Sequence, residues 1–311
     1  MIKVLITCPP MLKNIELFRP LFKKYDVEIF TPNVTQIMTV EELKKIVPDY
    51  DGWIIGDDPV TREVFKTGKD GKLKAAVKWG VGVDNIDLKA AKELNIALAN
   101  TPNMFGNEVA DVALSYVLAL ARETFVVDRK VRSGHWVKPT GISLAGRTAA
   151  IIGFGDIGSN VAKRLQACNM KINVYDPYYK CKEEIIPDEV LGWPDKIEFA
   201  DFIVLTCALT KENYHILNDR ILSRVKKGVR IVNVARGPLV DEKALIKSLE
   251  DEIVHSVALD VFEIEPLPID SGLRKFEKCI FGTHNSSNTI DAVIKTSELA
   301  ANILLKFLGI K

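Results

Sequence analysis

The chain has 311 residues, with 42 Lys and Arg against 41 Asp and Glu, so its formal net charge is +1. This length predicts about two domains and allows a large core without disulfides or metal ions. The balanced charge removes the electrostatic argument for binding nucleic acid or an anionic membrane, and 47% hydrophobic residues exclude general disorder.

The five cysteines are widely spaced, form no C-x-x-C pair and match no zinc-ligand spacing. We therefore expect reduced thiols and no metal site. The apolar stretch at the N-terminus is too short for a signal peptide, and no run of about 18 apolar residues could span a membrane. The expected location is the cytoplasm.

The first hundred residues alternate short apolar runs with amphipathic stretches. The apolar runs predict strands at 2–7, 27–30, 52–56, 75–78 and 96–99. The amphipathic stretches predict helices at 40–47, 61–65 and 88–94, the last capped by Asp87. Such alternation is typical of a parallel sheet covered on both faces.

A long helix is predicted next, from about 107 to 134. One face carries apolar residues at helical spacing: Ala110, Ala113, Leu114, Val117, Leu118 and Ala121. We expect this face to be core or a contact between subunits rather than a ligand site. The Gly- and Pro-rich stretch after it is typical of an arm or connector.

A second series of strands and helices starts at Arg147. Strands are predicted at 148–153, 171–176, 202–207, 229–234, 254–260 and 279–282, with a helix at 159–167 and a last helix at about 289–308. The chain is therefore predicted to be an α/β protein with two doubly wound parallel-sheet domains.

Residues 153–158, G-F-G-D-I-G, follow an apolar strand and precede a helix. In that setting the G-x-G-x-x-G pattern predicts a dinucleotide site, where the glycines allow a tight turn, close approach of a pyrophosphate and close packing of the helix. Asp176 ends the next strand, where a carboxylate can hold the adenosine ribose and repel a 2′-phosphate. The pattern therefore favours NAD over NADP.

Ligands of open α/β sheets bind at the carboxyl ends of strands. Arg236, Asp260 and His284 end predicted strands of the second series, and Glu265 lies in the loop after Asp260. An arginine in this place is suited to bind a carboxylate, although pairing with a loop acid is the alternative. A single histidine is more often structural than catalytic, and His135, His215 and His255 show no partner pattern.

Five motifs occur in order along the chain: G-V-G-V-D-N-I-D at 80–87, N-T-P at 100–102, the glycine turn at 153–158, N-V-A-R-G-P-L-V-D-E at 233–242 and L-D-V-F-E-I-E-P at 259–266. Together they resemble the D-isomer-specific 2-hydroxyacid dehydrogenases, the group that includes phosphoglycerate dehydrogenase. The resemblance covers essentially the whole chain, in a short form without a C-terminal regulatory domain.

The resemblance implies an NAD-dependent oxidoreductase that interconverts a small 2-keto acid and a D-2-hydroxy acid. His284 would be the general acid/base, Glu265 would favour its protonated form, and Arg236 would bind the carboxylate and polarise the keto oxygen. Asp260 would bind the nicotinamide carboxamide. The backbone of Val81 and Gly82 would hold the substrate carboxylate from the other domain.

The implied cofactor-binding set is Gly153, Gly155, Asp156, Ile157, Gly158, Asp176, Cys207, Val234, Ala235 and Asp260. In the implied fold, a Rossmann NAD-binding domain at 101–285 is inserted into a flavodoxin-like substrate domain formed by 1–100 and 286–311, with the catalytic cleft between them. The long helix and arm would form a homodimer interface.

The identity of the keto acid stays open among glyoxylate, hydroxypyruvate, pyruvate and phosphohydroxypyruvate. The loop at 56–59 lacks the basic residues that phosphate-handling members often carry, although Lys78 and Arg62 could supply positive charge. An NAD(H)-sensing, corepressor-like binding protein on the same scaffold is the alternative function. A formate-type enzyme is disfavoured, since those members use Gln where Glu265 stands.

Overall fold

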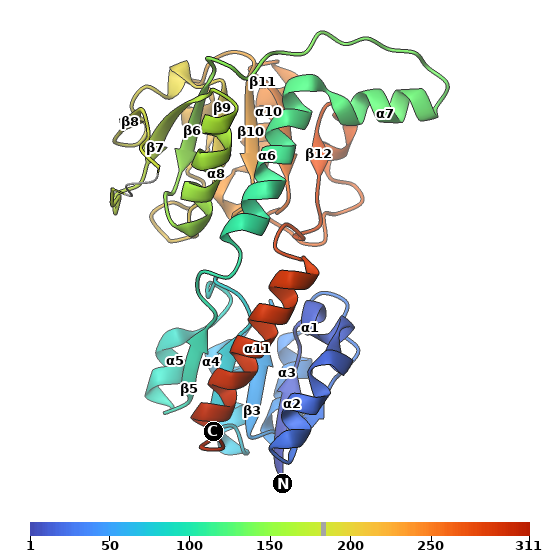
Figure 1. The fold of residues 1–311 in the computed structure, drawn as a ribbon, viewed down its shortest axis with the longest axis vertical. Helices are drawn as coiled ribbons and strands as arrows, with labels where there is room; N and C mark the ends of the chain where they lie inside the picture. The colour runs from blue at the N-terminus through green and yellow to red at the C-terminus, as the bar shows by residue number, and fades with distance from the viewer. Residues whose placement is uncertain (182–184) are drawn as a thin grey trace. The chain divides into compact units, whose positions relative to one another are not determined.

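The computed structural model describes residues 1–181 and 185–311. The chain folds into two units, which are residues 1–104 together with 288–311, and residues 105–287. We call them unit 1 and unit 2 and describe each by itself (Figure 1).

Unit 1 is built on a five-stranded, all-parallel sheet in the order β2-β1-β3-β4-β5. Its strands are β1 (Ile2–Ile6), β2 (Val27–Phe30), β3 (Gly52–Ile55), β4 (Ala75–Lys78) and β5 (Ala97–Asn100). This is the flavodoxin-like strand order. The helices are α1 (Pro9–Lys13), α2 (Arg19–Lys24), α3 (Val40–Ile46), α4 (Arg62–Asp70), α5 (Leu88–Glu93) and α11 (Ile290–Phe307).

The period-two alternation of β3 buries its residues on opposite faces of the sheet. Trp53 and Ile55 pack in one core cluster with residues of α3, α4 and α5. Gly52 faces the other way, where a Cβ would lie 3.0 Å from Leu308 and 3.1 Å from Leu304. The last helix of the chain, α11, therefore covers the second face of a sheet that the first hundred residues form, as Figure 1 shows in red over blue and cyan.

Unit 2 is built on a seven-stranded, all-parallel sheet in the order β12-β11-β10-β9-β6-β7-β8. Its strands are β6 (Thr148–Ile152), β7 (Lys171–Tyr175), β8 (Glu189–Val190), β9 (Phe202–Leu205), β10 (Val229–Asn233), β11 (Val254–Leu259) and β12 (Ile280–Phe281). Strand order reverses at β6, which is the Rossmann arrangement. The helices are α6 (Gly106–Arg122), α7 (Thr124–Arg132), α8 (Asp156–Ala167), α9 (Asp219–Leu222) and α10 (Glu242–Glu250). The predicted α/β class with two doubly wound parallel sheets is confirmed.

The predicted long helix at 107–134 is wrong in one respect, because the structure contains two helices there. Glu123 takes a left-handed conformation (φ 53°) between α6 and α7 and ends the first helix. The α6 face that was predicted to be apolar is buried only in part. Ala113 and Val117 are buried, whereas Leu118 is 41% exposed.

The sequence analysis also made no prediction for α1, α2, α9, α10 and β8, and the other differences concern the bounds of elements. Predicted strands end one or two residues too late at 153, 176, 207, 234 and 260, since those residues already belong to the loops at the carboxyl edge. Helix α4 extends to Asp70, well past the predicted end at Phe65, and α8 begins at Asp156. Thr289 and Asp87 cap α11 and α5 through their side chains. No helix in the described part of the chain is long and apolar enough to cross a membrane.

Candidate active site

The glycine-rich turn of unit 2 links β6 to α8 through closely packed backbone. Gly153 has a φ of 93°, and a Cβ there would lie 2.6 Å from the Cα of Cys207. A Cβ on Gly158 would lie 2.0 Å from the carbonyl oxygen of Gly153. Both positions therefore need glycine for structural reasons.

Gly155 differs, since a Cβ there would meet nothing within 4 Å. It precedes the first helical residue of α8, Asp156, and no side chain caps the helix start. The N–H groups at the start of α8 and the helix dipole make this open space a suitable place for a pyrophosphate. The residues present thus fit a dinucleotide, and Gly155, Asp156 and Ile157 would hold its phosphates.

The two glycines should respond differently to the same added methyl group. Gly158→Ala is expected to lower the free energy of unfolding by about 2–3 kcal/mol, because the methyl group overlaps Gly153. Gly155→Ala should change it by less than about 0.5 kcal/mol, yet weaken NADH binding at least about tenfold, since the methyl fills the phosphate space. Urea unfolding and NADH fluorescence titration measure the two effects. Unchanged NADH affinity in Gly155→Ala would contradict this placement of the phosphates.

Asp176 follows β7 and faces the glycine turn. Its carboxylate accepts hydrogen bonds from the backbone N–H of Phe154, at 2.6 Å, and of Tyr178, at 2.8 Å. These bonds fix the carboxylate beside the turn, at the point where an adenosine ribose would lie. Its ribose-binding role stays a prediction.

Three other residues of the expected cofactor set also lie at the carboxyl edge of this sheet. Cys207 follows β9, and Val234 and Ala235 follow β10. Burial raises the pKa of the Cys207 thiol to about 11, so this thiol is neutral at neutral pH and is suited to packing rather than nucleophilic chemistry.

The expected catalytic residues follow three adjacent strands. Arg236 comes after β10, Glu265 after β11 and His284 after β12, and these strands are neighbours in the sheet. The Nδ1 atom of His284 lies 2.8 Å from Oε2 of Glu265, and each side chain is 25% exposed. The other oxygen of Glu265 accepts from the N–H of Phe262 at 3.0 Å, so the carboxylate is held at both ends.

This pairing fixes what His284 can do chemically. A carboxylate at Nδ1 keeps a proton on that nitrogen and stabilises the imidazolium. The Nε2 atom is then the one that can exchange a proton with a ligand. His284 has a φ of 53°, a conformation that is uncommon for a non-glycine residue and that clusters at functional sites.

A buried asparagine that the sequence analysis did not single out holds the loop of Arg236. The Oδ1 of Asn233 accepts from the N–H of Ala235 at 3.0 Å, and its Nδ2 donates to the carbonyl of Arg236 at 2.8 Å. Asn233 is 1% exposed. Its position directly before V-A-R was the only sequence signal, and no spacing argument identified its role.

Asp260 is 2% exposed, and its two oxygens accept from the N–H groups of Asn285, at 3.2 Å, and Ser286, at 2.9 Å. The hydroxyl of Tyr116 on α6 also hydrogen-bonds to this carboxylate, and burial together with the carboxylate raises the pKa of Tyr116. Asp260 therefore fixes the backbone that follows His284. Its expected contact with a nicotinamide stays a prediction.

Val81 and Gly82 lie in unit 1, in the loop after β4 at the carboxyl edge of that sheet. Val81 is 41% exposed, and its carbonyl accepts from Nδ2 of Asn100 at 2.8 Å. The loop is thus anchored through β5, and its role in holding a substrate carboxylate stays a prediction.

A second histidine–carboxylate pair lies in unit 2, which the sequence analysis missed. The Nε2 of His215 lies 2.5 Å from Oε1 of Glu263. Glu242, at the start of α10, accepts from the N–H of Glu263 at 2.8 Å. Burial and the charges of Glu263 and Glu265 raise the pKa of the Glu242 carboxyl. Because 48 residues separate His215 from Glu263, no local pattern could reveal the pair. His255 likewise has an unforeseen partner, Glu123, at 3.6 Å.

Comparison with known proteins agrees with the arrangement of unit 2. Residues 114–286 match the family model of the D-isomer specific 2-hydroxyacid dehydrogenase, NAD binding domain. The matched residues lie within unit 2 and include the glycine turn and all the expected acid/base residues.

Relatives are similar over most of the chain. A hydroxypyruvate reductase of Thermotoga maritima is 35% identical over 93% of this chain and 94% of its own length. The chloroplastic D-3-phosphoglycerate dehydrogenase 2 of Arabidopsis thaliana is 36% identical over 86% of this chain, which spans only 44% of that longer protein. Among solved structures, the TT0316 protein of Thermus thermophilus has a TM-score of 0.88 at 29% identity, over 99% of this chain and 97% of that one.

Proposed function

Because the chain belongs to the D-isomer specific 2-hydroxyacid dehydrogenase family, an oxidoreductase family with an NAD-binding domain, we propose that it interconverts a small 2-keto acid and the corresponding D-2-hydroxy acid. The observation that carries the proposal is the pair formed by His284 Nδ1 and Glu265 Oε2 at 2.8 Å, in the loops after β12 and β11, at the same sheet edge as Arg236 after β10. A proton donor held by a carboxylate and a guanidinium suited to a carboxylate ligand thus follow three adjacent strands.

In the proposed reduction, bound NADH would supply the hydride that reaches the keto carbon. Arg236 binds the substrate carboxylate and stabilises negative charge on the keto oxygen, as a preorganised cation does. His284 donates the Nε2 proton to that oxygen, and Glu265 stabilises the imidazolium before this transfer. In the reverse direction His284 accepts the proton of the hydroxyl group.

We assign the remaining roles on the same basis. Residues 101–285 form the NAD-binding domain, and residues 1–100 with 286–311 form the substrate domain, where Val81 and Gly82 hold the substrate carboxylate. The near coincidence of these ranges with units 1 and 2 supports the division. The cytoplasm is the proposed location, and the free thiols of all five cysteines suit a reducing compartment.

The experiment that tests the function is a panel of keto acids, with loss of NADH absorbance as the readout and NADPH in parallel. Glyoxylate, hydroxypyruvate, pyruvate and phosphohydroxypyruvate form the panel, because relatives of equal similarity carry names with and without a phosphoryl group. Turnover of at least one keto acid with NADH is expected. Tight NADH binding without any turnover would instead support the sensor alternative, and a strong preference for NADPH would contradict the role of Asp176.

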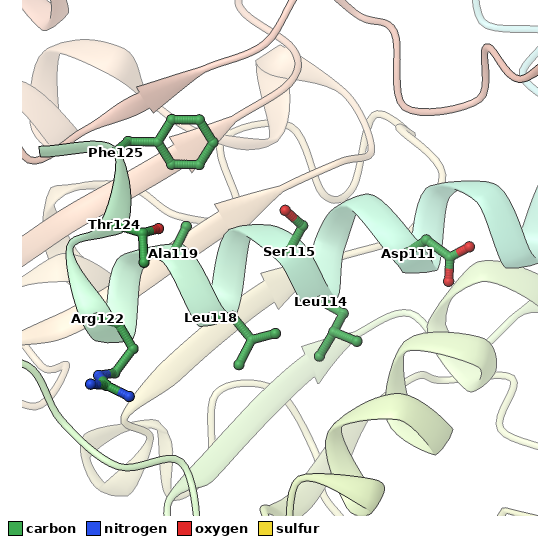
Figure 2. A pocket seen from close by; sticks show the side chains of 8 residues that line it. All are labelled: Asp111, Leu114, Ser115, Leu118, Ala119, Arg122, Thr124 and Phe125. Atoms are coloured by element: carbon green, nitrogen blue, oxygen red, sulfur yellow. The ribbon is translucent and has the colours of Figure 1, made fainter. Parts of the chain in front are cut away.

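We also propose that the protein is a homodimer that pairs through α6 and α7. Beside the junction of these helices lies a hollow of about 490 Å³, and its lining combines the apolar side chains of Leu114, Leu118, Ala119 and Phe125 with four polar or charged ones (Figure 2). Leu118 and Phe125 are 41% and 43% exposed there, and Trp136 in the following arm is 82% exposed. Exposed apolar side chains beside a hollow are typical of interaction surfaces, and two-fold dimers are the commonest assemblies.

Leu118→Lys is therefore expected to raise the dissociation constant of the dimer at least about a hundredfold, because it buries an unpaired charge in the interface. Sedimentation velocity over a concentration series measures it. Leu17→Lys is the matched control, since Leu17 is 57% exposed in unit 1, outside the proposed interface. A monomeric wild-type protein, or a Leu118→Lys variant that dimerises as before, would contradict this interface.

A further inference from the structure

A lysine is buried at the carboxyl edge of the sheet in unit 1. Lys78 is the last residue of β4, and its side chain is 3% exposed. Its Nζ donates to the carbonyl of Gly56 at 2.5 Å and to Oδ1 of Asp57 at 2.7 Å. A buried ammonium group needs such partners, because burial without them is costly.

The loop that supplies these partners is tightly fixed. A Cβ on Gly56 would lie 2.9 Å from the carbonyl oxygen of Thr7. Asp58 is fully buried and accepts from the hydroxyl of Thr7 at 2.5 Å and from the N–H of Met38 at 2.8 Å. Asp57 stands between these two anchored residues, so its carboxylate is held beside Lys78 by the backbone as well as by charge.

Of these two paired side chains, that of Asp57 is the one exposed to solvent. The side chain of Asp57 is 46% exposed, against 3% for Lys78. A ligand that approaches this edge therefore meets a carboxylate before an ammonium group, and the pair as a whole is neutral. Arg62, which follows the same loop at the start of α4, is paired with Glu93 at 2.5 Å.

The same sheet edge carries the loop of Val81 and Gly82, three and four residues after Lys78. In the function proposed above, which this inference rests on, that loop receives the substrate carboxylate. Because that loop directly follows β4, a substituent on the far carbon of a substrate held there would meet the ends of β3 and β4. A phosphoryl group carries a charge of about −1.5 to −2 at neutral pH and is bound by unpaired Arg or Lys donors.

We propose that Asp57 is a specificity-determining residue that cancels the charge of Lys78 and thereby selects an unphosphorylated 2-keto acid. The exposed carboxylate of Asp57 repels a phosphoryl dianion. Because the ammonium group of Lys78 is already paired, it does not compensate a bound phosphoryl group for the loss of that group's hydration. A hydroxyl group or a hydrogen atom at the same position meets neither the repulsion nor this desolvation cost. The substrate class is therefore that of glyoxylate and hydroxypyruvate rather than of phosphohydroxypyruvate.

The test compares two substrates that differ only in the phosphoryl group. The wild-type protein and Asp57→Asn are assayed with NADH on hydroxypyruvate and on 3-phosphohydroxypyruvate. The wild type should have the higher kcat/KM on hydroxypyruvate. Asp57→Asn removes the negative charge but keeps an oxygen that can accept from Lys78, so the loop should be retained. The ratio of kcat/KM for the phosphorylated over the unphosphorylated substrate should rise about tenfold.

Two further variants test whether the effect of Asp57→Asn on the kcat/KM ratio comes from the ammonium group of Lys78. Asp70→Asn, at the far end of α4, also removes one negative charge from unit 1 and releases Lys66, and it should leave the ratio unchanged. Asp57→Asn combined with Lys78→Met removes the released cation, so the ratio should return toward that of the wild type. Thermal unfolding of each variant verifies that it is folded.

The outcomes separate this inference from the proposed function. A wild type that prefers 3-phosphohydroxypyruvate, or an Asp57→Asn variant whose ratio is unchanged, overturns the inference alone. A gain in Asp70→Asn as large as that in Asp57→Asn also overturns it, because the effect would then be one of net charge. Absence of turnover on every keto acid overturns the proposed function and this inference with it.

Discussion

His284→Ala is expected to lower kcat for keto-acid reduction at least about a hundredfold, the usual scale for loss of a general acid. The dissociation constant of NADH should change by less than about threefold, because the glycine turn and Asp176 are separate from the altered side chain. Steady-state kinetics and NADH fluorescence titration measure the two quantities. A variant with normal turnover would contradict the assignment of His284.

His215→Ala is the matched control for this experiment. His215 and His284 are each 25% exposed, and each lies close to a glutamate of unit 2, Glu263 at 2.5 Å from His215 and Glu265 at 2.8 Å from His284. His215 also has Asp241 at 3.9 Å from its other ring nitrogen. Only His284 carries a proposed proton-transfer role. A kcat within about threefold of wild type is expected for His215→Ala, as for a substitution outside the chemistry. A loss as large as that of His284→Ala would show that the measured effect is structural.

Arg236→Ala is expected to lower kcat/KM by about a thousandfold, because the substrate loses both its carboxylate partner and the charge that stabilises the keto oxygen. Arg236→Lys should recover part of this loss, since a lysine keeps the charge but not the bidentate geometry. The loop itself should persist, because the side chain of Asn233, which the substitution leaves in place, is hydrogen-bonded to the backbone of Ala235 and Arg236. The comparison of kcat with KM for both variants separates binding from chemistry.

Unchanged kinetics in Arg236→Ala would favour the other interpretation of this residue, in which the guanidinium pairs with a loop acid for stability. That outcome would also predict a lower free energy of unfolding for Arg236→Ala. A substrate-binding role therefore predicts a change in kcat/KM, whereas a stabilising ion pair predicts a change in the free energy of unfolding.

Much of the architecture could be predicted from the sequence because its signals are local. Strands β2 (27–30) and β4 (75–78) were predicted with the observed bounds, since short apolar runs between polar residues leave one interpretation. The cap at Asp87 follows from a side chain that can accept hydrogen bonds from the N–H groups at a helix start. The glycine turn was recognisable because the steric demands on Gly153 and Gly158 leave no other residue.

The features that escaped prediction depend on contacts between distant residues. Glu123 breaks the predicted long helix, although glutamate is a good helix former. It is 9% exposed and pairs with His255 and Lys278, more than 130 positions along the chain, so tertiary contacts outweigh its local preference. The pairing of Lys78 with Asp57 is of the same kind, because it arises only where β3 and β4 lie side by side.

The placement of α11 has a consequence for how the protein is made. Unit 2 is continuous in sequence, so a ribosome completes it while α11 is still to be synthesised. Unit 1 begins first, yet Trp79 bonds to Ser297 at 2.9 Å and Gly52 faces Leu304. The part of its sheet that α11 contacts, at β3, β4 and β5, is therefore uncovered until Ile290–Phe307 has been translated. Residues 1–104 are thus synthesised before unit 2, yet they cannot complete their fold until unit 2 has been synthesised, and over that interval their uncovered apolar surface is open to aggregation.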